Sequence, residues 1–312
     1  MTTTDITPAE ATLPAVTHDT TLSDADLAAL RRAVQTLERP SLAARLSAAA
    51  GAPLDIIGRS LPAPVTEVVS RSTEAAMRTA LRVALATLPR TELAPADGSG
   101  LGTAAAKAES RIARLLGSGD AKHKAFAALS GALGGAFGLS TLAVELPVST
   151  TLMLRSIAEI AREEGEDLET PEGALACVQV FALGGRAQAA TEAGSALTES
   201  GYFAVRAALA KTLAEAARYA GSKTLLDQSA PALIRFTAQI AARFGLVVSQ
   251  KVAAQAVPIL GAFGGAAVNT AFMNHFQSTA RAHFTVRRLE RAYGAAAVRA
   301  AYEIEKAALG LG

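Results

Sequence analysis

Apolar residues recur every three or four positions along much of the chain, which is the spacing of one face of an α-helix. Ser23 is a favourable helix N-cap, and it is followed at this spacing by Leu27, Leu30, Val34 and Leu37. No run of strictly alternating apolar and polar residues indicates a β-strand. The pattern therefore predicts an all-α protein, a multi-helix bundle.

Local signals predict where several helices begin and end. Pro147 suits the first position of a helix, where its missing N–H group costs nothing. Thr170-Pro171-Glu172 predicts another helix start, and Gly184-Gly185 predicts its end. A final amphipathic helix is expected to run to about residue 308. Its apolar face would consist of Val286, Leu289, Tyr293, Ala297 and Ile304.

The distribution of Pro, Gly and Asp predicts the domain organisation. Residues 89–103 are rich in these residue types and form the best linker in the chain. Residues 1–22 are polar and read as a disordered tail. We therefore expect a helical N-terminal region over 23–100 and a larger helical domain over 101–312.

Two long stretches, 125–144 and 252–280, contain no Asp, Glu, Lys or Arg and are rich in Gly and Ala. We expect them to form two central helices of the bundle. Both contain a GAxGGA sequence, and small residues spaced four apart let helix backbones approach closely. The glycines expected to mediate this packing are Gly131, Gly134, Gly135, Gly138, Gly261, Gly264 and Gly265.

Each charge-free stretch is long enough to cross a bilayer, since a spanning helix needs about 20 apolar residues. Three interpretations of these stretches are compatible with the sequence. They could be buried core helices, a helix pair that associates reversibly with a bilayer, or stable transmembrane helices. Four arginines follow the second stretch, and they could face anionic lipid or pair with Glu290, Glu303 and Glu305. These arginines are Arg281, Arg287, Arg288 and Arg291.

Charge and cysteine content limit the expected binding partners and cellular location of the protein. The formal net charge is +2, which gives no support for a nucleic-acid partner. Cys177 is the only cysteine, which fits a reducing compartment, and we expect its thiol to be buried and inert. The N-terminus has no positive segment followed by an apolar run, so we expect no signal peptide. The expected location is the cytoplasm, or the inner face of a membrane.

The sequence contains no recognisable catalytic constellation. It lacks the HExxH, GxSxG and phosphate-binding GxxxxGK motifs. His275 and His283 would lie about 12 Å apart along a helix, too far for a metal pair. We therefore predict no metal and no cofactor, and a non-enzymatic role is favoured.

Glu145 is the most informative carboxylate because it follows 20 residues without a charge. It could be an ordinary acid near a helix N-terminus, stabilised by the helix dipole. It could instead be a buried acid that binds a ligand, a proton or a partner, since isolated buried charges are costly.

Several segments resemble the EcsC protein family. Residues 145–161 read ELPVSTTLMLRSIAEIA, and Gly165 to Leu168 and Thr170 to Glu172 follow them. The resemblance continues at Pro258 to Gly265, Asn269, Phe272, His283-Phe284, Arg287 to Glu290 and Tyr293-Gly294. It covers about residues 104–305, leaving the first 100 residues outside.

This family is named for a protein encoded beside an ABC transporter implicated in secretion, and it has no agreed catalytic residues. The resemblance thus implies a non-enzymatic protein at the cytoplasmic membrane face, with membrane lipid or a transporter as partner. The alternatives are a helical bundle that binds a lipid or another apolar ligand, and a hydrolase of unknown specificity. The candidate binding residues are Glu145, Thr151, Arg155, Asn269, His275, His283 and Arg287.

Overall fold

A computed structural model describes residues 22–38, 61–86, 88, 142–184, 201–222, 230–256 and 265–311. Within these residues the protein consists of eight helices and no strand, which confirms the predicted all-α fold. The helices are α1 (Asp24–Leu37), α4 (Ala63–Ala86), α7 (Leu142–Glu163), α8 (Pro171–Leu183), α10 (Tyr202–Ser222), α11 (Pro231–Ala256), α13 (Gly265–Tyr293) and α14 (Ala295–Ala308).

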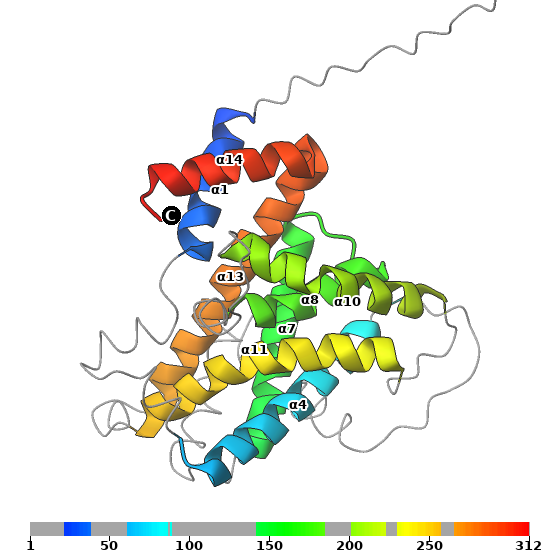
Figure 1. The fold of residues 1–312 in the computed structure, drawn as a ribbon, viewed down its shortest axis with the longest axis vertical. Helices are drawn as coiled ribbons and strands as arrows, with labels where there is room; N and C mark the ends of the chain where they lie inside the picture. The colour runs from blue at the N-terminus through cyan, green and yellow to red at the C-terminus, as the bar shows by residue number, and fades with distance from the viewer. Residues whose placement is uncertain are drawn as a thin grey trace, which may run out of the picture.

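The helices pack into one bundle (Figure 1). Helix α4 lies against α7 and α11, and α10 lies against α8 and α11. The long helix α13 contacts α7, α8 and α11, and it extends beyond them to meet α1 and α14 at one end of the bundle. Helices that precede residue 100 therefore pack directly against helices that follow it. The domain boundary predicted near residue 100 itself lies outside the described residues.

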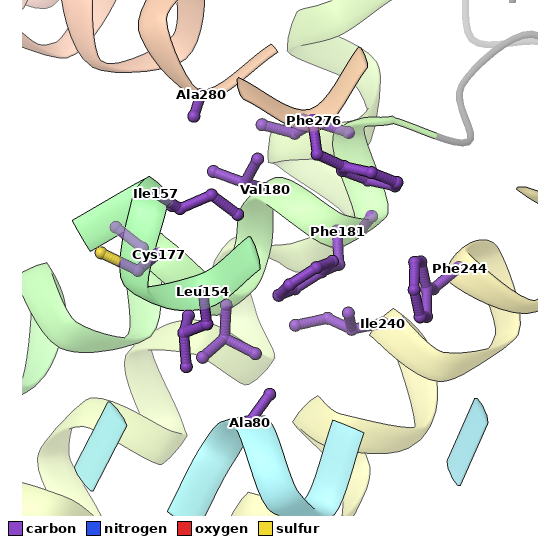
Figure 2. Close-up of a cluster of buried hydrophobic side chains, with 14 of the residues drawn as sticks. Ala80, Leu154, Ile157, Cys177, Val180, Phe181, Ile240, Phe244, Phe276 and Ala280 are labelled. Carbon is purple, nitrogen blue, oxygen red and sulfur yellow. The ribbon is translucent and has the colours of Figure 1, made fainter. Parts of the chain in front are cut away.

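All eight described helices contribute buried side chains to the core, and Figure 2 shows part of it around Phe181. Phe181 of α8 packs edge-on against Phe244 of α11, with ring centroids 5.1 Å apart, and also contacts Phe276 of α13. Ala80 of α4 and Leu154 of α7 close the cluster from the other side. Every residue of α8 from Gly173 to Leu183 is buried, so α8 is the central helix of the described bundle.

Only part of the two charge-free stretches can be followed. Residues 125–141, and with them Gly131, Gly134, Gly135 and Gly138, lie outside the described residues, as do Gly261 and Gly264. The second stretch is divided between the end of α11 and the first half of α13, which begins at Gly265. The predicted packing of the two GAxGGA segments therefore stays a prediction.

The predicted helix caps are confirmed. The Ser23 side chain accepts a hydrogen bond from the Asp26 backbone N–H at the start of α1. The Thr170 side chain accepts one from Gly173 at the start of α8, which ends at Leu183 with Gly184 as its cap. These signals are short-range, so the local sequence was sufficient to place them.

The prediction that Pro147 begins a helix was wrong, because α7 already begins at Leu142 and contains Pro147 inside it. At the sixth position a proline removes one backbone hydrogen bond that the helix would otherwise make. The earlier start buries Leu142 and Leu146 against the core. That apolar contact outweighs the missing hydrogen bond.

The predicted final helix is two helices. Gly294 has φ +86°, a conformation that glycine adopts readily, and it separates α13 from α14. The change of direction breaks the predicted apolar face. Val286 and Leu289 are buried, whereas Ile304 is 68 % exposed. In α14 the buried positions are Val298, Tyr302 and Glu305.

Candidate functional site

Glu145 lies in the first turn of α7 and is the centre of a polar cluster at one end of the bundle. Its Oε1 atom accepts hydrogen bonds from Lys251 Nζ at 2.9 Å and from Asn269 Nδ2 at 3.2 Å. Lys251 comes from the end of α11 and Asn269 from the start of α13. The structure thus brings together two predicted site residues, Glu145 and Asn269, and adds a third that was not predicted.

Lys251 is the most buried charged side chain of this cluster, with 1 % of it exposed. Burial lowers its pKa, and the neighbouring Glu145 carboxylate offsets part of that effect. The ammonium group also lies 5.2 Å from the centre of the Phe272 ring, a favourable cation–π distance. The hypothesis of a buried acid at Glu145 is therefore supported by its surroundings, and its partner is a lysine.

The predicted site residues Thr151, Arg155 and His275 have other surroundings. Thr151 donates a hydrogen bond to the Pro147 carbonyl within α7, and Arg155 is exposed on the same helix. His275 Nε2 lies 2.9 Å from the Gly184 carbonyl oxygen. Thr151 thus bonds within its own helix, whereas His275 bonds to the backbone at the end of α8.

The arginines at the end of α13 pair with acidic residues around the turn between α7 and α8. Arg287 makes two hydrogen bonds to Glu166, and Arg291 also pairs with that carboxylate. Burial alone would raise the pKa of Glu166, but its hydrogen bonds and charge contacts with these two arginines hold it below its ordinary value. Arg288 pairs with Glu164 and with Asp26 of α1.

Two of the three predicted partners of this arginine cluster were therefore wrong, and the pairing of Glu303 stays untested. Glu290 pairs with Arg206 of α10, and Glu305 pairs with Arg31 of α1. The arginines do pair with acidic residues, as predicted, but these acidic residues lie in other parts of the chain. Two of the arginines, Arg287 and Arg288, hold α13 against the α7–α8 turn, which is a structural role.

His283 belongs to a second buried network, between α13 and α10. Its Nδ1 atom lies 2.7 Å from the Tyr202 hydroxyl group, which also accepts a hydrogen bond from Arg206. Arg206 in turn makes two hydrogen bonds to Glu290. Donor and acceptor in the bond between the Tyr202 hydroxyl group and His283 Nδ1 depend on the tautomer of the imidazole.

The surroundings of His283 predict an acid-sensitive fold. Burial, with the nearby charges of Arg206 and Arg287, lowers its pKa well below the ordinary value of 6.5. The unfolded chain binds a proton near that pH and the folded chain does not, so stability falls as pH drops below 6.5. We expect a slope of up to about 1.4 kcal/mol per pH unit from this group.

Urea unfolding at a series of pH values between 6.5 and 5 measures this slope. His283→Asn removes the titration and keeps a hydrogen-bonding group towards Tyr202, so the slope should become shallower. Tyr202→Phe leaves His283 buried, so it should lower stability but keep the slope. A wild-type slope in His283→Asn would contradict the assignment.

Cys177 is buried on α8, and burial raises the pKa of its thiol to about 12. This burial confirms the first part of the prediction. A thiol with a raised pKa is a poor nucleophile at neutral pH, so the predicted inertness stays a prediction that its surroundings favour. The described residues contain no group of three or more His, Cys, Asp or Glu side chains that could hold a metal ion.

Lys251, Tyr202 and Arg206 were missed by the sequence analysis. Lys251 could have been found, because it is the last charged residue before the second charge-free stretch, just as Glu145 is the first after the other. If two apolar stretches pack against each other, opposite charges at their borders can form an ion pair. Tyr202 and Arg206 carry no comparable signal.

A comparison with protein families matches residues 24–289 to the EcsC protein family. The match begins at α1, so the predicted extent of 104–305 was wrong at its N-terminal side. The reason is visible in the fold, since α1 and α4 pack against α13, α7 and α11 and belong to the same core. No curated protein and no solved structure matches the chain.

Proposed function

This chain belongs to the EcsC protein family, and we propose that it is a non-enzymatic protein that docks on the cytoplasmic face of a membrane. The surface that would meet the lipid is the end of the bundle where α7 begins. A membrane transporter, as the family resemblance implies, would be its partner there.

The observation that supports this proposal is a pair of exposed valines at the start of α7. Val144 is 71 % exposed and Val148 is 40 % exposed, whereas most large apolar side chains of the described residues are buried. The two are four residues apart, so they lie one above the other on the same helix face. An exposed apolar surface beside a charge-free sequence favours contact with lipid.

The charges near these valines are already neutralised. Glu145 separates them in sequence, but its carboxylate points to Lys251 and Asn269 and its side chain is 8 % exposed. An unpaired charge in this position would oppose insertion into hydrocarbon. The buried pair therefore removes the main electrostatic obstacle to docking at this end.

The proposal is for docking on the bilayer and not for crossing it. Of the helices in the described ranges, only α11, over Pro231–Gln255, is long and apolar enough to span a membrane by length and composition. Its most apolar window is 44 % buried inside the bundle, and it contacts α4, α8 and α10. A core helix of this kind passes the same test, so α11 needs no lipid to explain its composition.

Co-sedimentation with phosphatidylcholine vesicles tests the proposal. Val144→Asp with Val148→Asp should weaken binding at least about tenfold, because two apolar side chains of roughly 1.5 kcal/mol each would be lost from the lipid contact. The matched control is Ile234→Asp with Ile304→Asp, which alters two other exposed apolar residues. Equal weakening by both pairs, or full recovery of the wild type in the soluble fraction at low salt, would contradict docking at this surface.

A further inference from the structure

A groove of about 560 Å³ lies between α1 and the part of α13 from Asn274 to Arg288. This volume falls within the range of small-molecule sites, roughly 300–1,000 Å³. Glu164, the residue after the end of α7, also lines the groove. The groove is therefore separated from Val144 and Val148, which are proposed to meet lipid, by almost the whole length of α7. That length is about 28 Å at 1.5 Å per residue.

Small side chains keep the groove open. Ala29 and Ala33 line it on α1, and Ala282 lines it on α13. Two helices in contact would normally fill the space between them with larger apolar residues, since protein interiors are close-packed. Here the alanines let the helices meet and still leave a volume between them.

The α13 wall of the groove is polar, although part of it is buried. Gln277 and Thr285 are almost completely buried, and both line the groove. The Gln277 amide donates to Ser156 Oγ at 2.8 Å, and the Thr285 hydroxyl donates to Glu164 at 3.0 Å. These bonds hold the wall in place. Asn274 and Ser278, one turn apart, are exposed and line the same wall.

Three arginines line the groove, and they differ in how firmly they are held. Arg288 is fixed by Asp26 and Glu164. Arg281 pairs with Glu163 at 3.2 Å, but these side chains are 54 % and 62 % exposed, and such surface pairs contribute little. Arg32, on the α1 wall, has no ion pair with another described residue. Two guanidinium groups, one from each wall, can therefore turn to an anion.

We propose that this groove binds a small molecule that carries a phosphate monoester. Arg32 and Arg281 bind the phosphate from opposite walls, since a planar guanidinium group matches the geometry of phosphate oxygens. The groove is larger than a phosphate ion alone, so the ligand has a polar remainder. Asn274 and Ser278 offer hydrogen bonds to it. The phosphate belongs either to a free metabolite-sized molecule or to a lipid headgroup.

Two probes test the proposal and separate the two sources. Isothermal titration with glycerol 3-phosphate measures binding of a free phosphate monoester. Co-sedimentation with phosphatidylcholine vesicles, with and without phosphatidic acid, measures binding of a headgroup. Arg32→Gln with Arg281→Gln should weaken binding at least about tenfold, because charge-assisted hydrogen bonds are lost. Ser278→Leu blocks the groove at an exposed position and should weaken binding without a change of charge.

The matched control is Arg71→Gln with Arg78→Gln, which removes the same charge from exposed positions on α4. The site is supported if the groove variants weaken the binding of at least one probe and the control variant does not. The probe that binds then shows whether the phosphate belongs to a free molecule or to a lipid headgroup. If neither probe binds, or the control weakens binding as much as the groove variants, the proposal fails. Val144→Asp with Val148→Asp should leave glycerol 3-phosphate binding unchanged, so this test is independent of the lipid docking proposed above.

Discussion

Replacing Gly173 by Ala is expected to destabilise the fold by about 3 kcal/mol, at the upper end of what overpacking usually costs. A Cβ atom at this position would lie 1.9 Å from the carbonyl oxygen of Asp167 and 2.8 Å from its carbonyl carbon. Both are backbone atoms, so no side-chain rotation can relieve the contact.

The segment that would have to move is firmly held. The Asp167 carbonyl accepts a hydrogen bond from the Thr170 hydroxyl at 2.8 Å, and that hydroxyl accepts one from the Gly173 N–H. The preceding residue, Glu166, is tied to Arg287 of α13. Displacing the turn would therefore disturb the start of the central helix and its contact with α13 together.

Urea unfolding measures the expected loss. The matched control is Gly245→Ala in the interior of α11, where a Cβ atom would meet only Thr73 at an ordinary 3.9 Å. That change should stabilise the protein by up to about 1 kcal/mol, because alanine favours the helix. A Gly173→Ala variant as stable as the wild type would show that the α7–α8 turn is free to shift.

Replacing Glu145 by Gln should destabilise the protein by about 3 kcal/mol at neutral pH, the cost of leaving a buried charge without its partner. The substitution keeps the shape of the side chain and removes only its charge. Lys251 would then be buried beside an uncharged amide. Changing both residues, Glu145→Gln with Lys251→Met, should restore most of the loss, because no buried charge remains.

The pH dependence identifies Lys251 as the cause. Burial already lowers its pKa in the folded protein, and removing the Glu145 charge lowers it further. The unfolded chain then binds more protons than the folded one up to the ordinary pKa of 10.5, so stability rises with pH in this range. The deficit of Glu145→Gln should therefore shrink in alkaline solution. Unchanged stability of Glu145→Gln at neutral pH would contradict the buried ion pair. Glu145 would then be an ordinary acidic residue at a helix N-terminus.

What could be predicted from the sequence was local. Ser23 and Thr170 cap helices through bonds to residues three positions away, and the sequence shows both partners at once. Glu145 stood out because its neighbours carry no charge. Its partner Lys251 is 106 residues away, and only the packing of α7 and α11 on α4 and α13 brings the two together.

The errors have the same origin. Pro147 is compatible with a helix start, but the burial of Leu142 and Leu146 begins α7 earlier. The apolar spacing continues through Gly294, and the spacing alone does not reveal that the backbone turns there. The central helix α8 was not singled out, because its 13 residues make a shorter apolar run than the two charge-free stretches.

The position of α1 has a consequence for synthesis of the chain. Its Arg31 pairs with Glu305, its Asp26 accepts a hydrogen bond from Tyr293, and Glu38, just after it, accepts one from Tyr302. These partners are synthesised long after α1, because they lie 264 to 274 residues further along the chain. At 5–20 residues per second, α1 waits roughly 10 to 50 seconds for them, and a helix of its length is marginal alone. During that interval Leu30, Val34 and Leu37, which are buried in the folded protein, lack the helices α13 and α14 that α1 packs against. Until α13 and α14 have been synthesised, the apolar face of α1 therefore lacks the helices it packs against, and a chaperone could bind it.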